Sequence, residues 1–429
     1  MYPPPRGVSM ATGHSPSSDD SRARNLPKVL AMPGVRRVRR PATDQAPAID
    51  LTYVRSGSGS SVPIVVLPGG PGLASVMPYQ SMRQKAAGAG LDVVMIEHRG
   101  VGASRTDTTG VDLGPQALRI PAVVDDIAAV LDAEGIEQAV IYGSSYGSYL
   151  AQAFGRTHPH RVAAMVLDSA MLDAHGEEVE REYARDLLWR GQRPELAGLA
   201  RKIRVLAGSG AVDVDELGQA VRITFEFGGP GLTERLLDQF VRGRARRTWR
   251  QIAALAQHDT ERVAPFVMEF DLVGVIAYRD LNYAGTPDGK IFDRSTGFTE
   301  LAQRYPDFAG EPYDLRAALP QFDWPVLVLS GDRDLRTPRP VAAEVAELAP
   351  EAQLVALPNT GHSALDTHML AALEAMGAVA AGTHQDLDSQ QLGALPRRGM
   401  SRHVATLIKA ALGTERLTPR RRPPRAPVP

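Results

Sequence analysis

The chain has 429 residues, of which 43% are hydrophobic and 23% charged; this composition is typical of a folded globular protein and excludes a wholly disordered chain. Its length allows two or three domains, or one large domain with an insertion. Cysteine is absent, which excludes disulfides, zinc–thiolate sites and a cysteine nucleophile. No apolar run reaches the roughly 18 residues that a membrane helix needs, so we expect no membrane partner.

The formal net charge of −1 hides an uneven distribution of charge. Residues 1–42 carry eight basic and two acidic residues, and five arginines lie from Arg416 onward, so the middle of the chain is acidic. This argues against a protein that coats nucleic acid, and we expect no nucleic-acid partner. Residues 1–42 are rich in Pro, Ser, Gly and Arg without apolar periodicity, so we predict a disordered basic leader there and a disordered tail from Thr418. The longest apolar run of the leader, 29–32, is too short for a secretion signal, and we expect a cytoplasmic protein.

Short apolar runs alternate with helical patterns along most of the chain. Residues 121–134 have apolar side chains at helical spacing and are followed by Gly135, which predicts a helix that ends there. Strands that alternate with helices are typical of a mostly parallel sheet covered by helices on both faces. The apolar runs predict strands over 63–67, 91–97, 139–142, 162–167, 325–329 and 353–357.

The strand pattern stops over about 150 residues and then resumes. Because this charge-rich, helical stretch lies between predicted strands, we predict a helical cap inserted into one α/β domain rather than a separate C-terminal domain. The predicted division is a disordered basic leader over 1–42, the first part of the core over 43–171, the cap over 172–320, the second part of the core over 321–382, and a C-terminal extension with a basic Pro-rich tail over 383–429.

A G-x-S-x-G motif over 143–147 follows a predicted strand and precedes a helical stretch. This is the context of a nucleophile elbow, a strand-to-helix turn so tight that the residues two before and two after the serine must be small. Ser144 does not meet this condition because Tyr142 and Tyr146 flank it at those distances. We therefore predict that Ser145 is the nucleophile, at a helix N-terminus whose dipole favours negative charge.

A serine nucleophile needs an adjacent base, and the base needs a carboxylate that orients it. His362 lies in a loop directly after a predicted strand, and we predict that it is the base. Asp334 and Asp332 both follow the preceding predicted strand; we favour Asp334, which lies deeper in its loop, and interpret Asp332 as a turn former. Asp168, at the end of another predicted strand, is a further alternative, with a loop or helix cap as its simpler interpretation.

A glycine-rich loop, Gly69-Gly70-Pro71-Gly72, follows the first predicted strand. Glycines let the backbone approach a substrate closely, and an acyl-transfer site needs backbone N–H groups that stabilise an oxyanion. We predict the N–H groups of Gly70 and of Tyr146, the residue after the nucleophile, as the two donors.

With these pieces in place, the chain resembles the α/β-hydrolase superfamily, and within it the proline iminopeptidase and tripeptidyl aminopeptidase branch of serine peptidases. Residues 67–72 are similar to that branch's H-G-G-P-G motif and 97–104 to its D-x-R-G-x-G-x-S motif. The elbow at 143–147 and the loops that contain Asp334 and His362 match its nucleophile, acid and base segments.

The resemblance extends over about 62–373 and implies the α/β-hydrolase fold, with a mostly parallel central sheet and an inserted helical cap. Two positions depart from the branch: Pro68 replaces the histidine of H-G-G-P-G, and Glu97 replaces the aspartate of D-x-R-G. The Trp-Glu signature that proline iminopeptidases carry in the cap is also not evident.

The resemblance implies an aminopeptidase that releases N-terminal residues from a peptide through a Ser-His-Asp triad and an acyl-enzyme. Carboxylates of the cap would then hold the free ammonium group. Residues 277–283 are similar to a cap segment A-R-x-E-x-x-Y, which assigns this role to Asp280, with a helix-surface salt bridge as its alternative and Glu269 as a second candidate. The alternative function is a carboxylesterase, lactonase or amidase that acts on a small acyl compound. No metal or cofactor is expected, and no oligomeric state is predicted.

Overall fold

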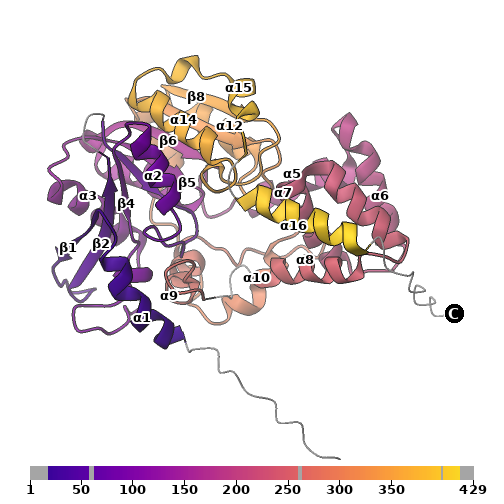
Figure 1. Cartoon of the computed structure of the whole chain (residues 1–429), viewed down its shortest axis with the longest axis horizontal. Coiled ribbons are helices and arrows are strands. Elements are labelled where there is room, and N and C mark those ends of the chain that lie inside the picture. The colour runs from indigo at the N-terminus through magenta and orange to yellow at the C-terminus, as the bar shows by residue number, and fades with distance from the viewer. Residues whose placement is uncertain (1–17, 58–61, 259–262, 398–399, 416–429) are drawn as a thin grey trace, which may run out of the picture.

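The computed structural model describes residues 18–57, 62–258, 263–397 and 400–415, and in this part of the chain eight strands form one sheet in the order β1-β2-β4-β3-β5-β6-β7-β8 (Figure 1). β1 and β2 run antiparallel to their neighbours, and the strands from β3 to β8 run parallel to one another. The strands are β1 (Val35–Arg40), β2 (Ile49–Ser56), β3 (Ile64–Leu67), β4 (Val93–Ile96), β5 (Ala139–Ser144), β6 (Val162–Asp168), β7 (Val326–Gly331) and β8 (Ala352–Leu357).

The six strands predicted from the apolar runs are confirmed as β3 to β8. Their side chains are buried on both faces of the sheet: Ile64 and Val66 of β3 join one hydrophobic cluster, while Val65 and Leu67 join another. Continuous apolar runs are what a sheet covered on both faces requires. One face is covered by α3 (Ile120–Ala133), α4 (Tyr146–Thr157) and α12 (Arg339–Leu348), and the other by α2 (Gln80–Gly88) and α14 (Met369–Ala380).

The prediction of a disordered leader over 1–42 is wrong for residues 18–42, which are ordered; residues 1–17 lie outside the described part. Ser18–Leu30 forms α1 and Val35–Arg40 forms the edge strand β1. Two arginines of β1 pair with acids far along the chain, Arg36 with Glu134 at 2.6 Å and Arg40 with Asp126 at 2.9 Å, while the other two pair with Asp50 of β2. Charged side chains are also a known way to protect an edge strand from aggregation.

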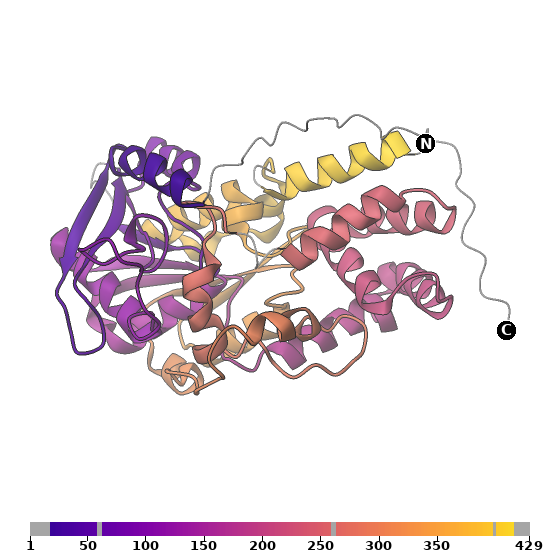
Figure 2. The ribbon, with the colours of Figure 1, turned by 90° about the horizontal axis from the view of Figure 1, so that it is seen from below.

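Between β6 and β7 the chain leaves the sheet and forms a helical layer with its own hydrophobic cluster (Figure 2). Its longest helix, α7, is kinked at Gly229, whose φ of 75° and missing side chain leave room for Arg333. The helices of this layer are α5 (Glu177–Arg185), α6 (Ala197–Gly208), α7 (Val214–Val241), α8 (Arg246–His258), α9 (Phe270–Val275), α10 (Ser295–Ala302) and α11 (Leu315–Ala318).

After α14 the chain forms α15 (Ser389–Ala394) and then α16 (Met400–Glu415), which lies along α7 and α8 of the cap (Figures 1 and 2). Leu412 of α16 is fully buried in the cap's cluster, and the Glu415 carboxylate accepts the backbone N–H of Thr248 at 2.7 Å. The C-terminal extension thus supplies part of the cap's packing, while the tail predicted from Thr418 lies outside the described residues. Among the helices described, none has the length and apolar character that a membrane crossing requires.

Candidate active site

The motif over 143–147 forms a sharp turn between a strand and a helix. β5 ends at Ser144, α4 begins at Tyr146, and Ser145 between them has φ 53° and ψ −121°, a conformation that is strained for a residue with a side chain. A Cβ on Gly143 would collide with the carbonyl oxygen of Gly147, and one on Gly147 would collide with that of Leu67. The spacing of the motif is therefore a steric requirement of this turn.

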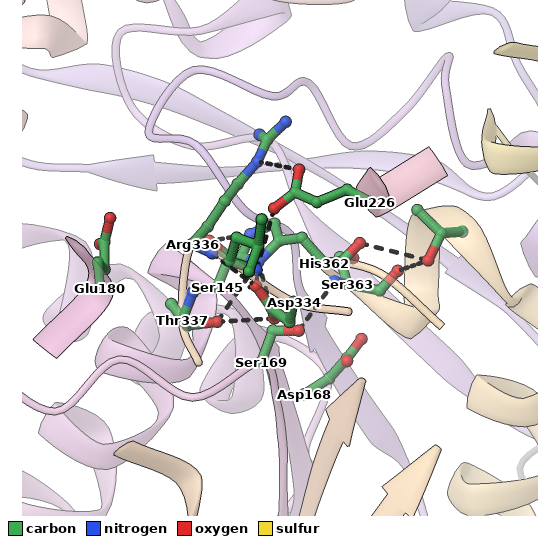
Figure 3. A network of polar contacts seen from close by, with 12 residues as sticks. Ser145, Asp168, Ser169, Glu180, Glu226, Asp334, Arg336, Thr337, His362 and Ser363 are labelled. Atoms are coloured by element: carbon green, nitrogen blue, oxygen red, sulfur yellow. Dashed lines mark hydrogen bonds and ion pairs between the residues drawn. The ribbon is translucent and has the colours of Figure 1, made fainter. Parts of the chain in front are cut away.

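Ser145, His362 and Asp334 form one chain of hydrogen bonds across three loops at the carboxyl edge of the sheet (Figure 3). The His362 Nε2 atom lies 2.8 Å from Ser145 Oγ, and its Nδ1 atom lies 3.1 Å from each carboxylate oxygen of Asp334. This is the geometry that lets a histidine take a proton from a serine while a carboxylate fixes its tautomer.

Asp334 is fully buried, and its carboxylate is surrounded by donors. It accepts the backbone N–H groups of Arg336 and Thr337 at 2.9 and 3.0 Å, and the Thr337 hydroxyl at 3.0 Å. Burial by itself raises the pKa of Asp334, but the charge and hydrogen bond of His362 and these N–H groups lower it to about 2. The carboxylate is therefore ionised at neutral pH, as an orienting acid must be.

The two alternative acids make other contacts. Asp168 is buried and accepts the N–H groups of Ala364 and Leu365, both at 2.8 Å, at the start of α13 (Ala364–Thr367). It is thus a helix cap that anchors the segment after His362, as its simpler interpretation states. Asp332 donates its backbone N–H to the carbonyl oxygen of Leu357, and the hydrogen bonds of the His362 ring go to Asp334, Thr337 and Ser145.

The predicted oxyanion loop runs directly past the nucleophile. A Cβ on Gly69 would lie only 3.2 Å from the Cβ of Ser145, so this glycine makes the closest approach. The neighbouring Gly70 has its carbonyl oxygen bound by the hydroxyl of Tyr283, a cap residue, at 3.2 Å. Tyr146 begins α4, and its buried ring is held by His98, whose Nε2 lies 3.0 Å from the tyrosine hydroxyl. The assignment of the Gly70 and Tyr146 N–H groups as donors stays a prediction.

The Glu97 carboxylate binds the backbone of the residues that follow this loop. The fully buried Glu97 carboxylate accepts the backbone N–H groups of Ser75 at 2.5 Å and Val76 at 3.1 Å, just after the loop ends. Gly102 is required because a Cβ there would overlap this carboxylate. Burial raises the pKa of Glu97 to about 7, and the N–H groups oppose the rise. The motif over 97–104 is thus a scaffold of the site.

The two carboxylates assigned to a substrate amine already have arginine partners in the structure, and their assignment stays a prediction. Asp280 is paired with Arg279 at 2.7 Å, and a substrate ammonium would have to displace this arginine. Only 6% of Asp280 is exposed, so the pair is buried and does not match the alternative of a salt bridge on a helix surface. Glu269 is fully buried and lies 3.0 Å from Arg22 and 3.4 Å from Arg105. Two arginines already neutralise it, and it offers no surface to a substrate.

Another cap carboxylate, Glu180, is not among the residues that the sequence singled out. It lies on α5, is half-buried, and pairs with Arg294 at 3.0 Å. Burial raises the pKa of Glu180, Arg294 lowers it, and the charge of Asp334 raises it further, so the carboxylate lies within electrostatic reach of the triad acid. Its charge also acts on Tyr283, which contacts the oxyanion loop. The signal in the sequence was the acidic first turn of α5, which follows β6.

Comparison with known proteins agrees with the fold. The model of the α/β-hydrolase fold family matches residues 62–261. Proline iminopeptidase of Neisseria meningitidis is 33% identical over 132 residues, which are 30% of this chain and 38% of that protein. Epoxide hydrolase B of Mycobacterium tuberculosis is 40% identical over 80 residues, which are 19% of this chain and 21% of that protein. The chain therefore spans well under half the length of these curated relatives.

A solved structure of proline iminopeptidase from Mycobacterium smegmatis aligns with 82% of this chain and 98% of its own length, at 19% identity and a TM-score of 0.47. This likeness is too distant to bear on activity. Among the described residues, no group of three or more histidine and acidic side chains is arranged to hold a metal ion. The order of its strands and the match to the family model show that the chain has the α/β-hydrolase fold, and part of its sequence is similar to proline iminopeptidases.

Proposed function

We propose that the protein is a serine aminopeptidase that releases residues from the free N-terminus of a peptide. The observation that carries the proposal is the continuous hydrogen-bonded chain from Ser145 Oγ through His362 to the buried Asp334. The partial similarity to proline iminopeptidases supports a peptide substrate.

In the proposed reaction, Ser145 Oγ attacks the carbonyl carbon of the scissile amide as its proton passes to His362 Nε2. The oxyanion accepts the N–H groups of Gly70 and Tyr146, while Asp334 stabilises the imidazolium that forms. His362 then gives the proton to the leaving nitrogen, the C–N bond breaks, and an ester to Ser145 remains. A water molecule, deprotonated by His362, attacks this ester; the bond between the acyl carbon and Ser145 Oγ breaks, His362 returns the proton to Ser145 Oγ, and the N-terminal residue or residues leave as a carboxylic acid.

Glu180 is the cap carboxylate that we propose for the substrate's ammonium group. Its charge acts on Asp334 and on Tyr283, whose hydroxyl binds the Gly70 carbonyl oxygen, so it lies within electrostatic reach of the proposed acid and of the predicted oxyanion loop. The present partner, Arg294, has 32% of its side chain exposed and can therefore be displaced at low cost.

The proposal is tested with aminoacyl-, prolyl- and tripeptidyl-chromogenic amides, each with a free and an acetylated N-terminus, beside short-chain nitrophenyl esters. We expect turnover of free-amine amides, and a loss of more than about 10⁴-fold in kcat for Ser145→Ala. Ester turnover without any amide turnover would contradict the peptidase proposal and favour the carboxylesterase or lactonase.

The role of Glu180 has its own test. Glu180→Gln removes the charge but keeps the shape, so KM for free-amine amides is expected to rise about tenfold, since an ion pair to a buried ammonium is worth on the order of 1–2 kcal/mol. The matched control is Glu178→Gln on the exposed face of the same helix. An equal rise in KM for acetylated substrates would remove Glu180 from this role.

A further inference from the structure

The cap helix α7 forms hydrogen bonds with the loop over 332–337, which carries the triad acid and which we call the acid loop. Arg222 and Glu226 lie one turn apart on α7 and are buried, with 7% and 4% of their surface exposed. Both bind the same residue of the acid loop: Arg222 Nη2 donates to the carbonyl oxygen of Leu335 at 2.6 Å, and the N–H of Leu335 donates to Glu226 Oε1 at 3.1 Å. Both polar groups of the Leu335 backbone are therefore satisfied by the cap and not by the core.

These contacts reach the triad acid through the rigid geometry of the peptide bond. The carbonyl that Arg222 holds and the N–H of Arg336 belong to one peptide unit, and that N–H donates to Asp334 Oδ1 at 2.9 Å. Because a peptide unit is planar, fixing the direction of its carbonyl also fixes the direction of its N–H. Glu226 holds the preceding peptide unit, whose carbonyl belongs to Asp334 itself.

Further contacts join α7 to the acid loop and to its neighbour. The Glu226 Oε2 atom also accepts Arg336 Nε at 3.3 Å, as Figure 3 shows. The side chain of Leu335 is fully buried in the hydrophobic cluster of the cap. The Glu226 backbone also packs against the loop that carries His362, which we call the base loop (358–362). A Cβ on Gly361 would lie 2.7 Å from the Glu226 carbonyl oxygen.

We propose that Arg222 and Glu226 are positioning residues of the triad, which hold the Asp334 carboxylate against His362 through the two peptide units around Leu335. The cap then has a second role besides covering the substrate: it completes the geometry of the catalytic acid. This inference rests on the proposed triad, though not on the identity of the substrate. It predicts that damage to α7 at these positions lowers the rate of the chemical step without weakening substrate binding.

The test uses the full-length protein and the variants Arg222→Met and Glu226→Leu, which keep side-chain bulk but remove the polar contacts. Two readouts do not depend on knowing the substrate: the rate at which a fluorophosphonate reacts with Ser145, and the downfield proton NMR signal of the hydrogen bond between His362 Nδ1 and Asp334. We expect a 10- to 100-fold slower reaction and a lost or shifted signal, because a displacement of about 1 Å at a catalytic group costs about that much. In turnover assays, kcat should fall and KM should stay within about twofold.

The chain offers matched controls for both variants. Arg185→Met removes another buried cap arginine that donates to a backbone carbonyl, that of Ile291 at 3.0 Å, and Glu216→Leu removes an α7 carboxylate that accepts Trp249 Nε1. Both should keep the Ser145 reaction rate, and Glu226→Gln, which retains an acceptor for the Leu335 N–H, should restore most of it. Thermal unfolding identifies any variant that has lost its fold.

The outcomes separate this inference from the proposed function. If wild-type Ser145 does not react with the fluorophosphonate, the triad itself fails. If the wild type reacts, and folded Arg222→Met and Glu226→Leu react equally fast with an unchanged proton signal, the triad stands and the positioning role is overturned. If the controls slow the reaction as much as the test variants, the effect belongs to cap stability, and the inference is likewise overturned.

Discussion

Asp168 and Asp334 stand at the carboxyl ends of two neighbouring parallel strands, β6 and β7, and have closely similar surroundings. Both are buried, and each accepts two backbone N–H groups and one hydroxyl, from Tyr142 in the first case and Thr337 in the second. Only Asp334 also has an imidazole at 3.1 Å. Burial raises the pKa of Asp168 despite its N–H donors, whereas the pKa of Asp334 is lowered to about 2.

The difference shows that burial and backbone hydrogen bonds alone do not make a catalytic acid. Both sites provide a cage of donors, and the partner that can become a cation decides the direction of the pKa shift. Asp168 instead holds the two residues that follow the base loop, at Ala364 and Leu365, so it acts on backbone. In the proposed triad, Asp334 therefore orients the base, while Asp168 anchors the residues that follow it.

The largest expected effect separates the two acids by activity. Asp334→Asn keeps the size of the side chain but presents the wrong hydrogen-bond partner to His362 Nδ1, so kcat should fall about 10⁴-fold, the loss known for the equivalent change in a serine-protease triad. The measurement is kcat on any substrate that the wild type cleaves, with circular dichroism to show that the fold is kept. A loss under tenfold would mean that Asp334 is not the orienting acid.

The second prediction is that substitution of Asp168 lowers the stability of the fold more than its activity. Asp168→Asn leaves a buried backbone N–H facing an amide NH₂, and a buried unsatisfied donor costs about 1–3 kcal/mol, so the free energy of unfolding should fall by about that amount. Urea denaturation measures this fall, and kcat should drop by less than about tenfold. If Asp168→Asn instead reduced kcat as strongly as Asp334→Asn, the conclusion that the two acids have different roles would be wrong.

The pH dependence of stability gives a third, smaller contrast. Because the folded pKa of Asp168 is raised, its contribution to stability is complete below the unfolded pKa of about 3.9 and is lost as pH rises through the folded value. The folded pKa of Asp334 is lowered, so its contribution is present above about pH 3.9 and is lost as pH falls towards 2.

The stability cost of the two substitutions should therefore change with pH in opposite directions. Urea denaturation between pH 3.5 and 7 is the measurement. The cost of Asp168→Asn should shrink as pH rises over this range, and that of Asp334→Asn should shrink as pH falls below about 5. Costs that change with pH in the same direction would show that the two carboxylates do not differ in the way described.

The parts of the fold that the sequence predicted correctly are those that depend on local pattern. The strands β3 to β8 are continuous apolar runs, and the elbow at 143–147 follows from the steric demand of one turn. The preference for Asp334 over Asp168 also agrees with the hydrogen bonds of the His362 ring, because position in a loop after a strand is readable from sequence.

The parts that sequence reasoning missed depend on contacts between distant segments. The sequence of β1 is rich in arginine and has no apolar pattern, so it predicts disorder. The acids that pair with Arg36 and Arg40 lie some 90 residues away in the sequence. Glu269, which the sequence offers as a candidate ligand, is paired with Arg22 across 247 positions of sequence. Glu180 was not singled out for the same reason, since its relation to Asp334 depends on how the cap sits on the core. The hydrophobic periodicity of a sequence carries no information about such contacts between distant segments.

The smallest prediction compares the two hydroxyls that complete the cages. Tyr142 donates to Asp168 at 2.8 Å, and its ring is fully buried in the sheet, so Tyr142→Phe removes one hydrogen bond and keeps the packing. The expected cost is about 1 kcal/mol of unfolding free energy, with kcat within about twofold. Thr337→Val removes the corresponding donor from Asp334, beside His362, and should lower kcat several-fold at a similar cost in stability. If Tyr142→Phe slowed turnover as much as Thr337→Val, Asp168 would act on the base itself, because the anchoring of a loop tolerates the loss of one of three donors more easily than the alignment of a proton acceptor does.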